Sequence, residues 1–464
     1  MTKRGLLTSY FDGITDSGHG ERYGTLIRFF IPEFITALLL YSMPFWVDAA
    51  FIGHLKSTST YATLGVTNNL LHLILKVAEA FGVGTIVLSG QFNGREDYKS
   101  VGRSLRGAFW LACFVGAAIA SVLYFGAPII FHWYGVKEKL ITLGIPFLRL
   151  RAIGVFFMFV YFALIGFLRG IKNTKTPMHI FVLGVLVFIS FDYVLIFGKL
   201  GFPALGLQGS ALATIMQYSF MLVLAVGYIF YREDHRKYGI ELFAPIRDGQ
   251  VVKHLLSLSW PVVLDKAILA ASYIWLAKMI SPMGTCGVAT FCVIKDMERF
   301  AFLPAIAAAQ VVTLLVSNDF GARNWQAIKS NIKKVIFISS FFVFSILLIL
   351  AFWSSSFIQL FDKKGNFTDF ASRSFWILSG LVFLDLLQLI LSGALRGAGN
   401  VKTVMMVRLL VSFGYFVPLS YMLSQLPIQD QVLKFVLIYG TFYVGQGLMS
   451  IFYIHRFRSD AWKA

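Results

Sequence analysis

The chain alternates between long apolar runs and short polar segments. An α-helix needs about 20 predominantly apolar residues to cross a bilayer, and twelve runs meet this requirement. We predict spanning helices at residues 29–55, 60–92, 107–136, 140–168, 178–198, 200–231, 254–280, 285–318, 335–361, 374–395, 409–429 and 435–454. This pattern predicts an all-α membrane protein, and an even number of spans places both termini on one side.

The loops between these runs differ in their content of Lys and Arg. The basic residues gather at both termini and in every second loop, at residues 95–106, 169–175, 232–253, 323–334 and 396–402. The other loops, near residues 56, 137–139, 199, 281, 363–373 and 434, hold few. Since basic loops stay in the cytoplasm, we expect a protein of the cell (inner or plasma) membrane with both termini cytoplasmic. Residues 1–24 lack the apolar core of a cleavable signal peptide.

Composition agrees with a lipid environment. Hydrophobic residues make up 57% of the 464 positions and charged residues only 14%, and a water-soluble chain of this length could hardly hide so much apolar surface. The formal net charge of +18 follows from the basic loops, so no nucleic-acid partner is needed to explain it. Cys113, Cys286 and Cys292 show no paired spacing and are interpreted as small packing residues.

The two halves of the chain repeat each other. Residues 164–178 and 391–405 are identical at nine of fifteen positions at an offset of 227, and a weaker match pairs Ser89, Phe92 and Arg95 with Ser317, Phe320 and Arg323. Six helices separate the matching segments, so the halves are parallel repeats. We predict a cytoplasmic segment 1–24, an N-lobe 25–231, a cytoplasmic linker 232–253, a C-lobe 254–455 and a cytoplasmic tail 456–464.

Six short motifs occur in the order and on the helices typical of one family. They are PFWVDAAFIGHL at 44–55, LRLRAIG at 148–154, DYVLIFG at 192–198, GSALAT at 209–214, DLLQ at 385–388 and GALRGAGN at 393–400. The chain therefore resembles the multidrug and toxic compound extrusion (MATE) family over nearly its whole length.

The resemblance implies a V-shaped pair of six-helix lobes that exchange organic compounds for H⁺ or Na⁺. It also implies a cation-coupling site inside the N-lobe, to which Asp48, Asp192 and Thr214 correspond. Two departures from the family pattern count against sodium coordination and against a site in the C-lobe. Phe188 stands where many sodium-coupled relatives have an Asn, and Leu269 and Ala270 lie about where many relatives carry an acidic residue in helix seven.

Charged side chains inside the predicted helices are the residues most suited to a mechanism. An ionisable residue at the bilayer centre costs about 2.5–3.5 kcal/mol, so it points to function. Asp48 and Asp192 can form an acid pair that exchanges protons, with a structural hydrogen-bond acceptor as the alternative for each. Asp385 and Gln388 are expected to face the interior of the C-lobe.

Three further features are candidates. Pro44 removes a helical hydrogen bond beside Asp48 and is a possible hinge. Two charged clusters, Lys76 with Glu79 in the second predicted helix and Lys295, Asp296, Glu298 and Arg299 in the eighth, are either ion pairs at an interface or cleft, or part of a cavity for a zwitterionic or anionic substrate. Asn68 in the second helix is a further candidate for the polar lining of a substrate cleft.

Several function classes lack their motifs. The sequence has no Walker A motif, no metal-ligand spacing and no nucleophile motif, so we expect neither an enzyme nor an ATP-driven pump. Nothing resembles a channel filter. The favoured function is a monomeric, cofactor-free antiporter that exports small amphipathic compounds from a lipid membrane in exchange for H⁺ or Na⁺. The alternative is a flippase of a lipid or lipid-linked saccharide.

Overall fold

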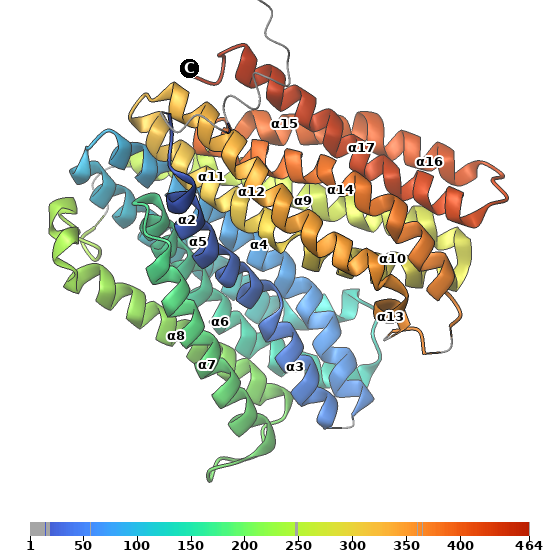
Figure 1. The fold of residues 1–464 in the computed structure, drawn as a ribbon. Helices are drawn as coiled ribbons and strands as arrows, with labels where there is room; N and C mark the ends of the chain where they lie inside the picture. The colour runs from blue at the N-terminus through green and yellow to red at the C-terminus, as the bar shows by residue number, and fades with distance from the viewer. Residues whose placement is uncertain are drawn as a thin grey trace, which may run out of the picture. The chain divides into compact units, whose positions relative to one another are not determined.

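A computed structural model describes residues 14, 19–55, 57–245, 249–359, 361–363 and 365–463. In these residues the chain is helical and has no strand, and twelve helices are long and apolar enough to cross a membrane (Figure 1). This confirms the predicted fold class. Most of the N-terminal segment and the loop residues Lys56, Arg247 and Lys364 lie outside the described residues.

The chain divides into two compact units. One, the N-unit, comprises Ile31–Trp260, and the other, the C-unit, comprises Met1–Phe30 and Pro261–Ala464. The first thirty residues thus belong to the unit built mainly from the second half of the chain. The lobe boundaries expected from the sequence stay predictions.

The N-unit consists of seven α-helices and one short 3₁₀ helix. They are the second part of α2 (Tyr23–Tyr41), α3 (Met43–His54), α4 (Thr58–Gly94), α5 (Tyr98–Trp133), α6 (Glu138–Gly170), α7 (Lys175–Phe197), α8 (Leu207–Tyr231) and η1 (Glu233–Tyr238), with the start of α9 (Gly249–Ile280). Helix α6 packs against α4, α5 and α8 and is the most buried span of this unit.

The C-unit continues from α9. It contains η2 (Ser281–Met283), α10 (Gly284–Ala301), α11 (Leu303–Gly321), α12 (Trp325–Phe352), α13 (Ser354–Gln359), α14 (Thr368–Gly397), α15 (Val401–Val411), the π-helical turn η3 (Ser412–Phe416), α16 (Val417–Gln425) and α17 (Gln431–Arg458). Helix α14 packs against α11, α12 and α17. Helix α14 therefore has the same central position in the C-unit as α6 has in the N-unit.

Some predicted boundaries are wrong. Residues 200–206 form a loop, in which Gly201 and Gly206 have positive φ, and helix α8 begins only at Leu207. The run predicted at 285–318 is interrupted at Phe302, just before Pro304. Helix α12 begins at Trp325 rather than 335, because Asn324 caps it and its polar first turns continue the helix beyond the apolar run.

Equivalent glycines allow a close helix crossing in each half. A Cβ atom on Gly166 of α6 would lie 2.6 Å from the Gly82 carbonyl oxygen of α4, and one on Gly393 of α14 would lie 2.9 Å from the Ala309 carbonyl oxygen of α11. Both pairs are related by the offset of 227. The repeat seen in the sequence is therefore a repeat of packing, since the same helix pair makes the same backbone approach.

The turns that follow α4 and α11, and those that follow α6 and α14, also repeat. Asp97 accepts a hydrogen bond from the Ser100 amide at 3.1 Å, and Asn324 accepts one from the Ala327 amide at 3.2 Å. After α6 and α14 the chain turns through a positive φ at Lys172 and at Gly399. Each of these pairs again differs by 227 residues.

A buried lysine fastens the segment before α2 to α12. Lys334 is 1% exposed, and its ammonium group donates hydrogen bonds to the carbonyl oxygens of His19 and Glu21, both at 3.1 Å. The Glu21 amide donates to Asn331 at 2.8 Å, and the Phe30 ring stacks on Phe342. These contacts explain why the start of α2 belongs to the C-unit.

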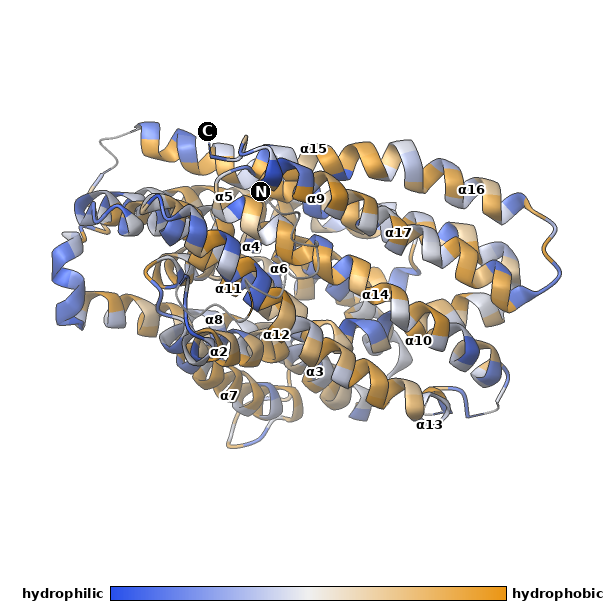
Figure 2. Ribbon diagram, turned by 45° about the horizontal axis from the view of Figure 1, so that its top comes forward, coloured by the Kyte–Doolittle hydropathy of each residue, from blue (hydrophilic) through white to orange (hydrophobic). Residues whose placement is uncertain are grey.

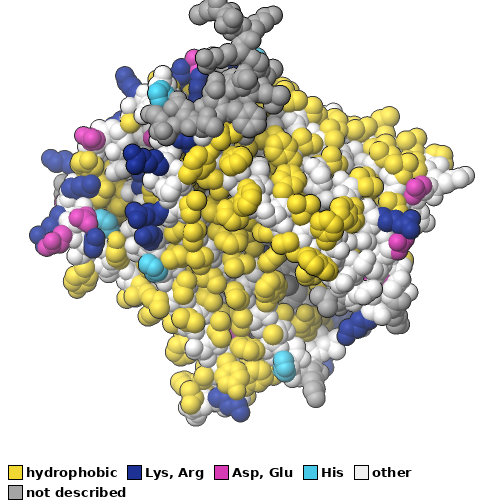
Figure 3. All heavy atoms as spheres, viewed as in Figure 1, with side chains coloured by type: hydrophobic (Ala, Val, Ile, Leu, Met, Phe, Trp, Pro, Cys, Tyr) yellow, Lys and Arg dark blue, Asp and Glu magenta, His cyan; other side chains and the backbone are white. Residues whose placement is uncertain are grey.

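Polar residues gather at the turns, whereas the helices are apolar along most of their length (Figure 2). In the N-unit the end formed by the α4–α5 turn, the end of α8 and η1 carries a group of Lys and Arg side chains beside a broad hydrophobic surface (Figure 3). Arg106 pairs there with Glu241 at 3.1 Å, and Tyr238 bonds to Asn93. This distribution agrees with the predicted cytoplasmic end, whose side of the membrane stays a prediction.

Candidate functional site

Asp48 lies on α3, just after an interruption of the first spanning segment. Helix α2 ends at Tyr41, and α3 restarts after Ser42 with Pro44 in its first turn. Proline cannot donate the hydrogen bond that would continue the helix, so the break falls where the sequence predicted a hinge. The Asp48 side chain is buried, at 2% exposure. A buried carboxylate needs partners.

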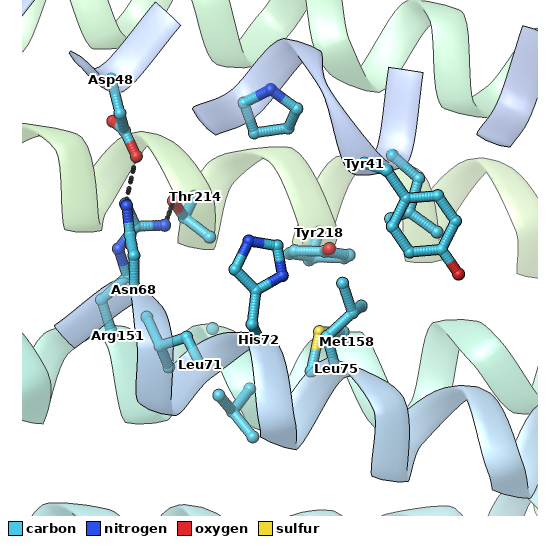
Figure 4. Close-up of a pocket in the computed structure, with 14 residues that line it drawn as sticks. Tyr41, Asp48, Asn68, Leu71, His72, Leu75, Arg151, Met158, Thr214 and Tyr218 are labelled. Atoms are coloured by element: carbon cyan, nitrogen blue, oxygen red, sulfur yellow. Dashed lines mark hydrogen bonds and ion pairs between the residues drawn. The ribbon is translucent and has the colours of Figure 1, made fainter. Parts of the chain in front are cut away.

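The partner of Asp48 is Arg151 of α6. A terminal nitrogen of Arg151 donates to Asp48 Oδ2 at 2.6 Å, and the other terminal nitrogen donates to Thr214 Oγ1 (Figure 4). The first of these nitrogens also donates to Ser210 Oγ at 3.0 Å. Ser210 in turn donates to Asp48 Oδ1. Both carboxylate oxygens of Asp48 are therefore engaged, and the guanidinium joins α3, α6 and α8.

Asp192 of α7 is the second acid of this site. It is fully buried, and neither carboxyl oxygen has a hydrogen-bond partner in the described part of the chain. The charges of Asp48 and Arg151 both act on it, and Ser210 lies beside it. The structure thus brings Asp48, Asp192 and Thr214 together, as the family resemblance implied. Phe188, one turn before Asp192, is buried and contributes no oxygen.

A cavity of about 120 Å³ adjoins the Asp48–Arg151 pair. Its polar lining comes from Asp48, Asn68, His72, Arg151 and Thr214, and Tyr41 and Tyr218 lie toward its other end (Figure 4). The remaining lining is aliphatic, from Leu40, Pro44, Leu71, Leu75, Gly154, Val155 and Met158. The cavity is smaller than the roughly 300–1,000 Å³ of pockets for drug-sized ligands. In this conformation it suits an ion, a proton pathway or a few water molecules.

Lys76 and Glu79 form an ion pair on α4. The Lys76 ammonium lies 3.1 Å from the Glu79 carboxylate and 3.8 Å from the centre of the Tyr41 ring, and the Tyr41 hydroxyl donates to Glu79. Asn68, two turns earlier, lines the cavity described above. The sequence left open an ion pair or a charged cavity for a substrate, and the structure has an ion pair between these two residues.

The C-unit holds a separate buried ion-pair network. Asp265 of α9 is 1% exposed and accepts hydrogen bonds from Arg396 of α14 at 2.6 Å and from Arg408 of α15. Helix α9 thus carries a buried acid one turn before Leu269, although the sequence comparison found no acidic counterpart at Leu269 and Ala270. Two guanidinium groups already neutralise this carboxylate.

The other predicted residues of the C-unit do not form one cluster. Gln388 is 1% exposed and Asp385 is half-buried on α14, where Arg408 and Lys266 act on it. Glu298 of α10 is buried and accepts a 2.6 Å hydrogen bond from Tyr439, whereas Asp296 is exposed. Positions two residues apart point to different sides of a helix, so these two acids cannot share a site.

Sequence reasoning missed the arginines of both networks and the acid Asp265. Arg151 was noted only as part of a motif, and Asp265 and Arg408 were not singled out. Arg169 was seen only as part of the repeat, and it donates to Glu33 at 2.8 Å. Counting the acidic and basic residues inside the predicted helices could have identified these residues, because a buried guanidinium requires a buried anion. Among the described residues, no group of three or more His, Cys, Asp or Glu side chains is placed to hold a metal ion.

Comparison with known proteins gives a consistent result for both halves. The MatE family model matches residues 34–194 and 261–422. A probable multidrug resistance protein of Bacillus subtilis (strain 168), YoeA, is 25% identical over 405 residues, which cover 85% of this chain and 86% of that protein. The probable multidrug resistance protein NorM of Thermotoga maritima is 22% identical over 376 residues, with 81% and 80% covered. A crystal structure of MATE in the bent conformation superposes with a TM-score of 0.84 at 20% identity and covers 94% of each chain.

Proposed function

This chain belongs to the MatE family of multidrug efflux transporters, and on that premise we propose that it exports small amphipathic organic compounds by antiport with protons. The two relatives described above are named as probable multidrug resistance proteins. Together with the MatE match they favour this function over the flippase of a lipid or lipid-linked saccharide. The protein acts as a monomer within the membrane and needs no cofactor other than its coupling ion.

The observation that carries the proton coupling is the isolated carboxyl group of Asp192. Its two oxygens have no hydrogen-bond partner in the described part of the chain, and the neighbouring Asp48 already has Arg151 as its counterion. An ionised Asp192 therefore adds one uncompensated negative charge to a buried site, and binding one proton removes it. Such a group can take up a proton from one side of the membrane and release it to the other.

Exchange requires that proton and substrate exclude each other. The cavity beside Asp48 is apolar on most of its wall, and its polar end holds the charged pair. An amphipathic compound entering a widened form of this cavity would place its apolar part on the aliphatic wall and its polar group near Asp192. Protonation of Asp192 would remove the charge that holds a cationic group, and thereby release the substrate.

The direct test replaces Asp192 by Asn in the purified transporter, reconstituted in liposomes. We expect Asp192→Asn to reduce export of dyes or drugs driven by a pH gradient by at least about tenfold, equivalent to about 1.4 kcal/mol, while binding of the same compounds persists. Asp234→Asn, which changes an aspartate that is 74% exposed outside the membrane, is the matched control. Transport at the wild-type rate in Asp192→Asn would exclude this residue as the proton carrier.

If both acids acted only as proton carriers, Asp48→Asn would give the same loss of transport with normal expression. The structure changes this expectation, because the variant leaves the Arg151 guanidinium buried without its anion. Breaking a buried ion pair in this way costs about 3–5 kcal/mol. We therefore expect Asp48→Asn to lose both transport and stability, and Asp192→Asn to lose transport alone.

A further inference from the structure

Arg151 occupies the place where a coupling cation would bind. Its terminal nitrogens contact Asp48 Oδ2, Ser210 Oγ and Thr214 Oγ1, and hard cations bind to oxygen atoms of this kind. We propose that Arg151 is a tethered cation that fills this oxygen site, excludes Na⁺ from it and so makes H⁺ the coupling ion. This inference rests on the function proposed above and names the residue that sets its ion specificity.

The guanidinium is suited to a permanent role in this site. It stays protonated at any physiological pH, and its planar array of donors fixes several acceptors at once. The Asp48–Arg151 bond is short, at 2.6 Å, and both side chains are at least nine-tenths buried. A cation bound covalently to α6 cannot be released to either side of the membrane. The positive charge in this site is therefore a fixed part of the protein and not a transported ion.

The carboxyl oxygens that remain without a hydrogen-bond partner are too few to bind a sodium ion. Asp48 Oδ1 accepts from Ser210 and Oδ2 from Arg151, so of the four carboxyl oxygens of Asp48 and Asp192 only the two of Asp192 have no hydrogen-bond partner in the described part of the chain. Phe188 presents a ring, one turn away, where an oxygen would be needed. A hard metal cation that has shed its water requires about six oxygen ligands, whereas a proton requires one oxygen atom.

The charges of the site fit the uptake of one proton. With Asp192 ionised, Asp48, Arg151 and Asp192 together carry one negative charge, and with Asp192 protonated they carry none. The proton binds to a carboxyl oxygen of Asp192 and leaves from it, and no other bond forms or breaks. The titratable or charged groups that line the adjoining cavity are Tyr41 of α2, Asp48 of α3, His72 of α4, Arg151 of α6 and Tyr218 of α8.

The test compares the effect of sodium on the purified protein with and without this guanidinium. Melting temperatures are measured in detergent in NaCl and in KCl of equal ionic strength. We expect no difference for the wild type and a rise of at least about 2 °C in NaCl for Arg151→Ala, because Na⁺ can then bind to the vacated oxygen atoms. The double variant Asp48→Asn with Arg151→Ala should show a smaller sodium effect than Arg151→Ala, because it lacks one of the two carboxylates of the site.

Arg149→Ala is the matched control, since Arg149 is on the same helix and donates to the Tyr124 carbonyl oxygen instead. It should melt at the same temperature in both salts. A sodium-specific stabilisation of the wild type would overturn the proposal, and so would a folded Arg151→Ala that gains none. Should Arg151→Ala not fold, Arg151→Gln removes the charge with a similar volume and carries the same expectation.

Transport separates this inference from the proposed function. In liposomes the wild type should respond to a pH gradient and not to a sodium gradient, and His72→Asn should keep that preference, which excludes His72 as the titrating group. If the wild type exports none of the compounds, the proposed function fails, while the melting comparison still decides whether Arg151 blocks sodium. If export is driven by sodium in the wild type, the inference and the proton coupling both fail, and only the export of organic compounds stands.

Discussion

Arg169 and Arg396 stand at equivalent positions of the two repeats, and each is paired with a carboxylate from the first spanning segment of its own half. Arg169 donates to Glu33 at 2.8 Å, and Arg396 donates to Asp265 at 2.6 Å. The arginines differ by the repeat offset of 227, but Asp265 lies five residues beyond the equivalent of Glu33, about one helical turn. Each half thus keeps a buried ion pair at its core.

The Asp48–Arg151 pair has no such counterpart. The same offset places Trp275 and Leu378 at the equivalent positions of the C-unit. Trp275 donates to Ser420 at 2.9 Å, and Leu378 is fully buried. The ion pair beside Asp192 therefore has no equivalent at these positions of the C-unit, and the two halves differ at this site although they share a fold.

Asp265→Asn should strongly destabilise the C-unit. The substitution leaves Arg396 and Arg408 buried without their common anion, at an expected cost of about 3–5 kcal/mol. The melting temperature of the purified protein should fall by several degrees. Asp369→Asn is the control, because Asp369 and its partner Arg373 are 78% and 69% exposed and such pairs contribute little. Equal melting temperatures for both variants would show that the network does not stabilise the fold.

Gly166→Ala and Gly393→Ala should destabilise the two halves to a similar extent. At each position a Cβ atom would meet a backbone carbonyl oxygen, at 2.6 and 2.9 Å, and the helices would have to separate at a cost of about 1–3 kcal/mol. Gly380→Ala, on the same helix as Gly393 but with open space around it, should be neutral or slightly stabilising. Melting temperatures measure all three. A Gly166→Ala protein as stable as Gly380→Ala would contradict the close crossing.

A fall in pH should destabilise the segment that follows α8, residues 232–245. His235 in η1 is buried against Phe167, Tyr228 and Tyr238, and this burial lowers the pKa of its imidazole below the ordinary value of 6.5. The folded state therefore favours neutral His235. Its stabilising contribution is present above the unfolded pKa and is lost as the pH falls through the lower, folded pKa.

Hydrogen exchange of residues 232–245, corrected for the intrinsic effect of pH, tests this prediction. Exchange should be faster near pH 5 than at pH 7.5, where the histidine is neutral. His235→Phe keeps an aromatic ring and should abolish the dependence. A segment that exchanges equally at both pH values in the wild type would show that His235 does not hold it.

The fold could be predicted to a large extent from the sequence, because length and hydropathy determine which segments can cross a bilayer. The repeat of the two halves followed from local identity alone. The start of α12 could not be predicted, since its polar first turns hold the segment before α2 through Lys334, a contact between residues far apart in the chain. Asp296 and Glu298 could have been separated beforehand, because residues two apart do not share a helix face.

The candidate site could be predicted only in part. Asp48, Asp192 and Thr214 came from the resemblance, and no local pattern connects Asp48 with Arg151, which lies 103 residues away. Their pairing depends on the packing of α3 against the other helices. The same limit applies to Asp265, whose partners come from α14 and α15.

The attachment of the segment before α2 has a mechanical consequence. Lys334 holds Glu21 in the C-unit, whereas Arg169 holds Glu33 in the N-unit. Only twelve residues separate these anchors, a length of about 18 Å for a helix. Any change in the distance between these two anchors must stretch, bend or unwind the short part of α2 that joins them.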